Sequence, residues 1–200
     1  MKEIIRQKLQ ETKSELVLEA VSAYFDRVGY TKPKMQDIAK EVGISVGALY
    51  KLFPSKDALF FAYIAYQIRL FHKHLQERCK VCQTPKQALL TYIQLKIETF
   101  IAKKKAIEDP VLGDPLFFLK MNVHKENPAK PVYEFLEEQF VRLAKEHTLK
   151  AIEPMQLAYI FNAHILAYIE YWINFDGELL GKEEEILSTF LDGIKDEKCK

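Results

Sequence analysis

The sequence has 200 residues, of which 48% are hydrophobic and 28% are charged, a composition typical of a globular protein with a buried core. The formal net charge of +1 does not by itself indicate a nucleic-acid partner. The first ten residues lack the apolar run of a signal peptide, and no uncharged apolar stretch is long enough to cross a bilayer. We therefore expect a cytoplasmic protein with no membrane partner.

A regular apolar repeat predicts a long first helix over about 3–28. Its apolar residues, Ile5, Leu9 and Leu16 among them, keep the three-and-four spacing of one buried stripe. Gly29 predicts the end of this helix, because glycine accepts the left-handed backbone of a helix cap.

Proline, glycine and serine mark the boundaries of three further helices. Pro33 suits the first turn of a short second helix, and Gly43 interrupts the chain after it. Ser45 predicts the N-cap of a third helix, which Pro54 stops, and Ser55 predicts the N-cap of a long fourth helix.

The remaining chain also has helical periodicity, and no β-type alternation of any length is present. We expect later helices at roughly 85–105, 110–124, 130–147, 154–176 and 182–195, with boundaries uncertain by about 2–4 residues. The sequence therefore predicts an all-α fold.

The two short helices joined by residues 43–45 form a candidate helix-turn-helix. If the third helix packs its apolar side inward, a small, apolar and aromatic face with one cation projects outward: Val46, Gly47, Tyr50 and Lys51. Gly47 costs a helix about 1 kcal/mol relative to alanine, and close approach to a DNA backbone would explain it. An ordinary helix-turn-helix inside a bundle has the same periodicity, so that alternative stays open.

A continuous match to a known family covers residues 17–63, VLEAVSAYFDRVGYTKPKMQDIAKEVGISVGALYKLFPSKDALFFAY. This stretch resembles the DNA-binding domain of the TetR family of bacterial transcriptional repressors, above all in Gly43-Ile44-Ser45, Gly47-Ala48-Leu49-Tyr50 and Phe53-Pro54-Ser55-Lys56. The resemblance implies a three-helix DNA-binding domain at 1–55 and a helical ligand-binding and dimerisation domain at 56–200. It also implies a homodimer that binds a palindromic operator.

The family's roles, carried onto this sequence, predict a set of DNA-contacting residues: Lys34, Ser45, Val46, Gly47, Tyr50, Lys51 and Lys56. Tyr50 and Lys56 would contact phosphates, which position a protein without reading sequence. Lys51 could donate to guanine, and Val46 could touch a thymine methyl. The family usually has threonine or serine where this chain has Pro33-Lys34, so we expect a changed entry angle of the second helix.

The resemblance implies that the last two helices form the dimer seam. The expected seam residues are Tyr171, Phe175, Leu187, Phe190, Leu191 and Ile194. An apolar cavity for an unidentified small hydrophobic or aromatic ligand is expected from residues that could equally be plain core: Phe117, Phe118, Met121, Tyr133, Phe140, His164 and Tyr168.

Cys79 and Cys82 form the only spacing typical of metal or redox sites. A single CxxC lacks a second ligand pair, so we expect no metal and no cofactor. A thiol switch and two incidental cysteines both stay possible interpretations.

No grouping of nucleophile and base or phosphate-binding glycine loop is present, so we expect no enzyme. The leading hypothesis is a ligand-responsive repressor. The alternatives are a TetR-like DNA-binding protein without a small-molecule inducer, under redox or protein control, and a helical enzyme or adaptor with an incidental helix-turn-helix.

Overall fold

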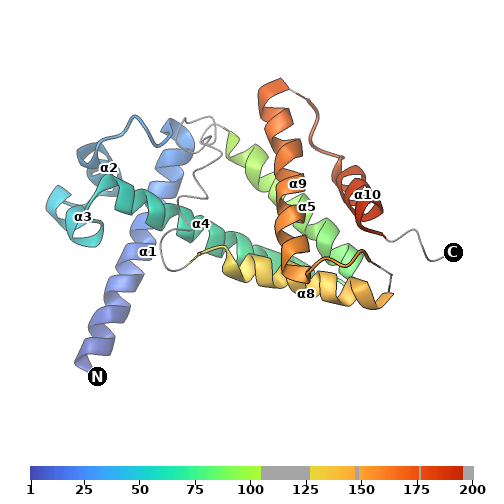
Figure 1. Cartoon of the computed structure of the whole chain (residues 1–200). Helices are drawn as coiled ribbons and strands as arrows, with labels where there is room; N and C mark the ends of the chain where they lie inside the picture. Colours follow the sequence, from blue (N-terminus) through green and yellow to red (C-terminus); the bar gives the residue numbers. More distant parts are fainter. Residues whose placement is uncertain (105–126, 147–148, 176, 196–200) are drawn as a thin grey trace. The chain divides into compact units, whose positions relative to one another are not determined.

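The computed structural model describes residues 1–104, 127–146, 149–175 and 177–195 (Figure 1). Within these ranges the regular elements are all helices, and the only β-type pairing is an isolated antiparallel bridge between Leu149 and Lys195. The helices are α1 (Lys2–Val28), α2 (Met35–Val42), α3 (Val46–Leu52), α4 (Lys56–Cys79), α5 (Pro85–Ala102), α8 (Lys130–Glu146), α9 (Pro154–Phe175) and α10 (Glu183–Ile194).

The all-α prediction is confirmed, and the expected helix boundaries agree with the described ones to within a few residues. The helix expected at 110–124 lies outside the described residues. The first half of α1 differs from expectation, because Ile5, Leu9 and Leu16 are exposed, as is the neighbouring Ile4. Only from Val17 onward does the apolar stripe of α1 become buried.

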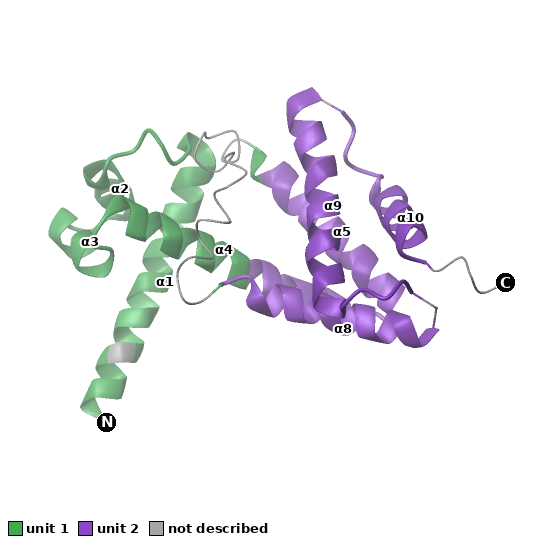
Figure 2. Cartoon of the chain, viewed as in Figure 1, with its two compact units in different colours: residues 1–69, 103–127 green, residues 70–102, 128–200 purple. Residues whose placement is uncertain are grey.

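The chain divides into two compact units (Figure 2). Unit 1 comprises residues 1–69 and 103–127, and unit 2 comprises residues 70–102 and 128–200. The division therefore falls inside α4. Among the described helices, none is both long and apolar enough to span a membrane.

Aromatic rings form the centre of unit 1. The Tyr30 ring, in the α1–α2 connection, stacks on Phe60 of α4 with 3.8 Å between centroids. Phe25 of α1 meets the edges of Tyr30 and Tyr63 at 5.6 and 5.3 Å. Ile38 of α2 is fully buried in the same core. This packing joins α1, α2 and α4 around one core, on which α3 rests.

In unit 2, α8 packs against α9 and α5, and α10 packs against α5 and α9. The α10 helix contributes a buried stripe that includes Phe190, whose ring lies 4.9 Å from Phe161 and 5.8 Å from Phe140. These three rings from three helices form the centre of the unit 2 core.

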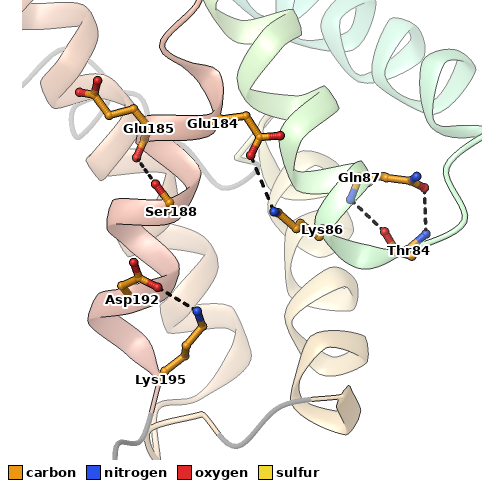
Figure 3. Close-up of polar contacts among 8 residues, drawn as sticks. All are labelled: Thr84, Lys86, Gln87, Glu184, Glu185, Ser188, Asp192 and Lys195. Atoms are coloured by element: carbon orange, nitrogen blue, oxygen red, sulfur yellow. Dashed lines mark hydrogen bonds and ion pairs between the residues drawn. The ribbon is translucent and has the colours of Figure 1, made fainter.

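Polar contacts at the start of α5 and along α10 add to this packing (Figure 3). Thr84 and Gln87 cap α5 reciprocally, because each side-chain oxygen accepts the other residue's backbone N–H at 3.2 Å. Lys86 of α5 lies 3.7 Å from Glu184 of α10, an exposed pair that contributes little to stability.

Two glycines should respond in opposite ways to the same substitution. Gly43 has φ +75°, so Gly43→Ala should lower the free energy of unfolding by about 1 kcal/mol. Gly193 lies within α10, and an added Cβ there meets nothing within 4 Å. Gly193→Ala should therefore leave stability unchanged or raise it by up to about 1 kcal/mol. Urea unfolding of both variants tests this, and equal effects would contradict the backbone argument.

Candidate nucleic-acid interface and ligand site

The local sequence determines where α2 ends and where α3 begins. Gly43 takes the left-handed conformation that ends α2, and its N–H donates to the carbonyls of α2's last turn. The Ser45 hydroxyl accepts the Ala48 N–H at 3.1 Å, which caps α3. Leu49 is fully buried and Phe53 nearly so, so these two side chains anchor α3 to the core of unit 1.

The opposite side of α3 faces solvent. Gly47, Tyr50 and Lys51 are exposed, and 45% of Tyr50 is accessible. A Cβ built on Gly47 meets nothing within 4 Å, so no other part of the described fold requires a glycine there. Val46 differs from the expected outward position, because it is half-buried against the core of unit 1.

Two lysines flank this face. Lys34 is exposed, and its backbone N–H donates to the Asp37 carboxylate at 2.9 Å, which caps α2. The Lys56 ammonium donates to the Thr31 carbonyl at 2.9 Å and lies 4.5 Å from the centre of the Tyr30 ring. Lys56 therefore ties α4 to the α1–α2 connection, in addition to any contact with phosphate.

A buried polar cluster lies in unit 2. The Lys96 ammonium of α5 donates to the Tyr92 hydroxyl at 3.2 Å and to the Asn162 side-chain oxygen of α9. The Tyr92 hydroxyl donates to that oxygen at 2.7 Å, and the Asn162 amide donates to the Tyr133 hydroxyl of α8 at 3.1 Å. We call these four residues the Lys96 cluster. Its outer end is a stack of Tyr133 on the exposed Tyr159, 3.9 Å apart.

Lys96 carries a charge that burial disfavours. Burial lowers the pKa of its ammonium to about 7, from an ordinary value of 10.5. Burial also raises the pKa of Tyr133 to about 12 and raises that of Tyr92 further, so both hydroxyls stay protonated near neutral pH. No ion pair of Lys96 is present among the described residues.

The sequence predicted Tyr133 as a ligand residue but missed Tyr92, Lys96 and Asn162, the other members of the Lys96 cluster. The available signal was a lone lysine inside the apolar run of α5, Tyr92-Ile-Gln-Leu-Lys96-Ile97. Its partner Asn162 lies 66 residues away, so only the tertiary fold brings the two together.

The ligand residues expected from the sequence have different outcomes. Phe117, Phe118 and Met121 lie outside the described residues. The His164 ring nitrogen lies 3.1 Å from the Ile186 carbonyl, and its ring contacts Tyr168 and Phe190. His164 is half-buried with its described hydrogen-bond partner on α10, and Tyr168 is half-buried beside it.

A groove of about 440 Å³ in unit 2 lies between the ends of α8 and α9. It is lined by Phe140, Ala144, Lys145, Glu146, Leu149, Lys150, Ile152, Pro154 and Leu157, and of the expected ligand residues only Phe140 is among them.

The residues expected in a dimer seam differ in how far their own subunit buries them. The four α10 residues expected there, Leu187, Phe190, Leu191 and Ile194, are buried inside unit 2 and offer little free surface. A single stripe of period 3.6 cannot tell burial within a subunit from burial between subunits. Tyr171 and Phe175 of α9 are 62% and 70% exposed, so these two remain available to a partner.

The cysteines of the CxxC are free thiols. Burial, together with the nearby Cys82, raises the pKa of the Cys79 thiol to about 12, which disfavours the reactive thiolate. In the part of the chain that the structure describes, no three His, Cys, Asp or Glu side chains gather as metal ligands would.

Comparison with known proteins finds a family match within the first third of the chain. Residues 17–63 match the family model of the bacterial regulatory proteins, tetR family. Over 54 residues the chain is 43% identical to YuxN, an HTH-type transcriptional regulator of Bacillus subtilis (strain 168). The matched residues cover 27% of this chain and 19% of YuxN. Over 192 residues it is 26% identical to YerO of the same organism, covering 92% of this chain and 64% of YerO.

Solved structures share the fold over most of the chain. A TetR transcription regulator from Haloarcula marismortui ATCC 43049 has a TM-score of 0.72 at 16% identity, covering 93% of this chain and 100% of that chain. FadR from Bacillus subtilis, solved in complex with stearoyl-CoA, has a TM-score of 0.69 at 16% identity, covering 90% and 98%. The fatty acid degradation regulator FadR from Bacillus halodurans has a TM-score of 0.71 at 13% identity, covering 90% and 94%.

The buried ammonium predicts an unusual pH dependence of stability. Since the pKa of Lys96 is lower in the folded state, the unfolded chain binds more protons between pH 7 and 10.5, and stability should rise across that window. Lys96→Met removes the penalty, and it should raise the free energy of unfolding at pH 7 by on the order of 3 kcal/mol.

The advantage of Lys96→Met should shrink as the pH approaches 10. Urea unfolding at pH 7 and pH 10 measures it, and Lys86→Met, an exposed change on the same helix, serves as the control with little effect at either pH. A destabilised Lys96→Met at pH 7 would show that the ammonium's hydrogen bonds outweigh the cost of its burial.

Proposed function

We propose that this chain, which carries the DNA-binding domain of the TetR family and has the fold of TetR-type transcriptional regulators, is a repressor that a small ligand releases from a palindromic operator. The observation that carries the proposal is the exposed side of α3. This side carries a glycine with free space around it, an exposed tyrosine and an exposed lysine. The buried side chains of Leu49 and Phe53 anchor the opposite side of the helix to the core.

The geometry of α3 suits insertion into a major groove. Gly47 lets the helix approach the DNA closely, while Lys51 can donate to a base edge and Tyr50 to a phosphate. Lys34 lies at the start of α2 and Ser45 lies at the start of α3. Phosphate contacts are favourable at the start of a helix. Lys56 can neutralise a phosphate in either of two ways. It keeps its contact with the Thr31 carbonyl and contacts the phosphate as well, or it gives that contact up.

Ligand control is supported by the likeness of the fold to regulators solved with small molecules. One is FadR of Bacillus subtilis with stearoyl-CoA, and another is a regulator from Saccharomonospora viridis with choline, at a TM-score of 0.63 and 14% identity. In this chain we assign ligand binding to unit 2, whose helices surround a core of aromatic rings. The alternative of a regulator without a small-molecule inducer predicts operator binding that no ligand changes.

Homodimerisation is supported by an exposed apolar face on α9. Ile160 and Tyr171 lie on this face with the small residues Ala163 and Ala167 between them, at helical spacing. Small residues let two helices approach closely, and exposed apolar residues gain from being covered. We therefore place the seam on this face of α9, with Phe175 at its end.

The function is tested by selecting genomic fragments on the purified protein. A repressor of this type should enrich fragments that share a palindromic sequence, and it should bind them far more tightly than unrelated DNA at physiological salt. Enrichment without any shared sequence would contradict specific operator binding. The genes beside the bound fragments would then narrow the class of ligand to be tested.

Gly47→Leu should separate stability from DNA binding. Leucine is a better helix former than glycine and meets open space there, so the melting temperature should stay the same or rise. The same side chain should obstruct the approach of α3 to the groove and remove most of the specific affinity. Circular-dichroism melting and titration with a selected fragment test both effects in one preparation. Unchanged DNA affinity would mean that another face of unit 1 reads the operator.

A charge on the proposed seam should weaken the dimer. Ala167→Glu places a carboxylate among exposed apolar residues of α9, and it should convert a dimer to monomers without unfolding the subunit. Ala144→Glu, on an exposed position of α8, is the matched control and should remain dimeric. Sedimentation velocity distinguishes the two, and an intact Ala167→Glu dimer would move the seam to another surface.

A further inference from the structure

We propose that the Lys96 cluster binds the carboxylate head of an amphipathic, singly charged acid, so that the ligand of unit 2 is an organic acid with an apolar body. This inference rests on the proposed ligand-responsive function and names the chemical class of its ligand. It narrows the expectation of a small hydrophobic or aromatic ligand to an acid.

The orientation of one amide determines which donors are free. A lysine ammonium can only donate, so with Lys96 charged the Asn162 atom that faces it must be the oxygen. The amide nitrogen of Asn162 therefore faces Tyr133 and donates to its hydroxyl oxygen. That leaves the Tyr133 hydroxyl proton without an acceptor among the described contacts, although the hydroxyl is partly buried.

Lys96 has a free donor as well. Its ammonium has three protons, and the described acceptors are two neutral oxygens, those of Tyr92 and Asn162. The Asn162 oxygen thus contacts the Lys96 ammonium, and the Asn162 amide nitrogen contacts the Tyr133 phenol. Each of these two partners has one proton left to donate. A carboxylate offers two oxygens that can accept one proton from each.

Charge favours the same occupant. A buried ammonium without a countercharge is costly, and an anion placed beside it would recover that cost. A single lysine matches one negative charge, which favours a carboxylate over a doubly charged phosphate. For the same reason, a cationic ligand should be excluded from this position.

The surroundings of the cluster are aromatic, which favours an apolar body on the acid. The Tyr92 ring meets the edge of Phe71 at 5.7 Å and lies 6.0 Å from Phe161. Two members of the cluster, Tyr133 and Asn162, are half-buried, and Tyr133 stacks on the exposed Tyr159, so the cluster reaches the surface of the described residues there. A ligand that enters there would place its head inside and its apolar part against these rings.

Direct binding of chosen probes tests the proposal without DNA. Dodecanoate, 4-butylbenzoate, dodecanol and dodecylamine are titrated into the full-length protein by calorimetry at pH 6. At least one acid should bind about tenfold or more tightly than dodecanol, and dodecylamine should bind more weakly than either. The two acids distinguish an alkyl from an aromatic body. Equal binding of acid and alcohol, or no binding of either acid, would overturn the assignment.

Variants then locate the head group. Lys96→Met should lose about tenfold or more of the acid affinity while leaving dodecanol binding unchanged, whereas Lys86→Met should bind both as the wild type does. Tyr133→Phe should weaken acid binding less than Lys96→Met does. Asn162→Asp supplies a tethered carboxylate to Lys96, so it should also weaken acid binding. Acid binding that survives in Lys96→Met, with melting curves showing a folded protein, would contradict the proposal.

The pH dependence gives a readout that a merely structural lysine would not change. Since free Lys96 loses its proton with a pKa of about 7, acid affinity should be about tenfold weaker at pH 8 than at pH 6. Lys96→Met should lack this dependence. Failure here and failure of the proposed function are separable. Genomic-fragment binding that persists while no acid binds overturns only the ligand class, and loss of fragment binding with acid binding intact overturns only the DNA role.

Discussion

Packing of aromatic rings in unit 1 is the interaction on which the exposed face of α3 depends. The stack of Tyr30 on Phe60 and the edge contacts of Phe25 join α1, the connection that follows it, and α4. Each such pair contributes about 0.5–1.5 kcal/mol beyond its buried area. Because α2 and α3 are too short to be stable alone, their orientation follows from this core. The exposure of Gly47, Tyr50 and Lys51 to solvent is therefore a consequence of rings that are themselves buried.

The helix boundaries were predictable because local chemistry determines them. Gly43 and Ser45 act through backbone conformation and a cap over three residues, and a sequence displays both. The family resemblance likewise covers one continuous stretch, and the family model matches the same residues, 17–63. The exposed start of α1 was not predictable, because its apolar spacing is that of a buried stripe and only the tertiary fold leaves it uncovered.

The sites of unit 2 were less accessible to sequence reasoning, for two physical reasons. The Lys96 cluster joins residues of three helices that lie tens of residues apart in the sequence, and no local sequence pattern predicts such contacts. The sequence predicts the stripe of α10 in a dimer seam, and in the structure Phe190 of that stripe packs against Phe140 and Phe161 inside the subunit. Apolar periodicity indicates that one face of a helix is buried, but it does not indicate whether the same subunit or a second subunit covers that face.

The exposed first half of α1 affects how the chain opens. Over residues 1–16 the helix is largely solvent-exposed, and a helix of that length is marginal in water without packing. Its backbone amides should therefore exchange with solvent through local fraying, long before those near Val21 and Phe25, whose exchange requires opening of the aromatic core. One continuous helix thus contains two levels of protection, and the transition between them falls near Val17.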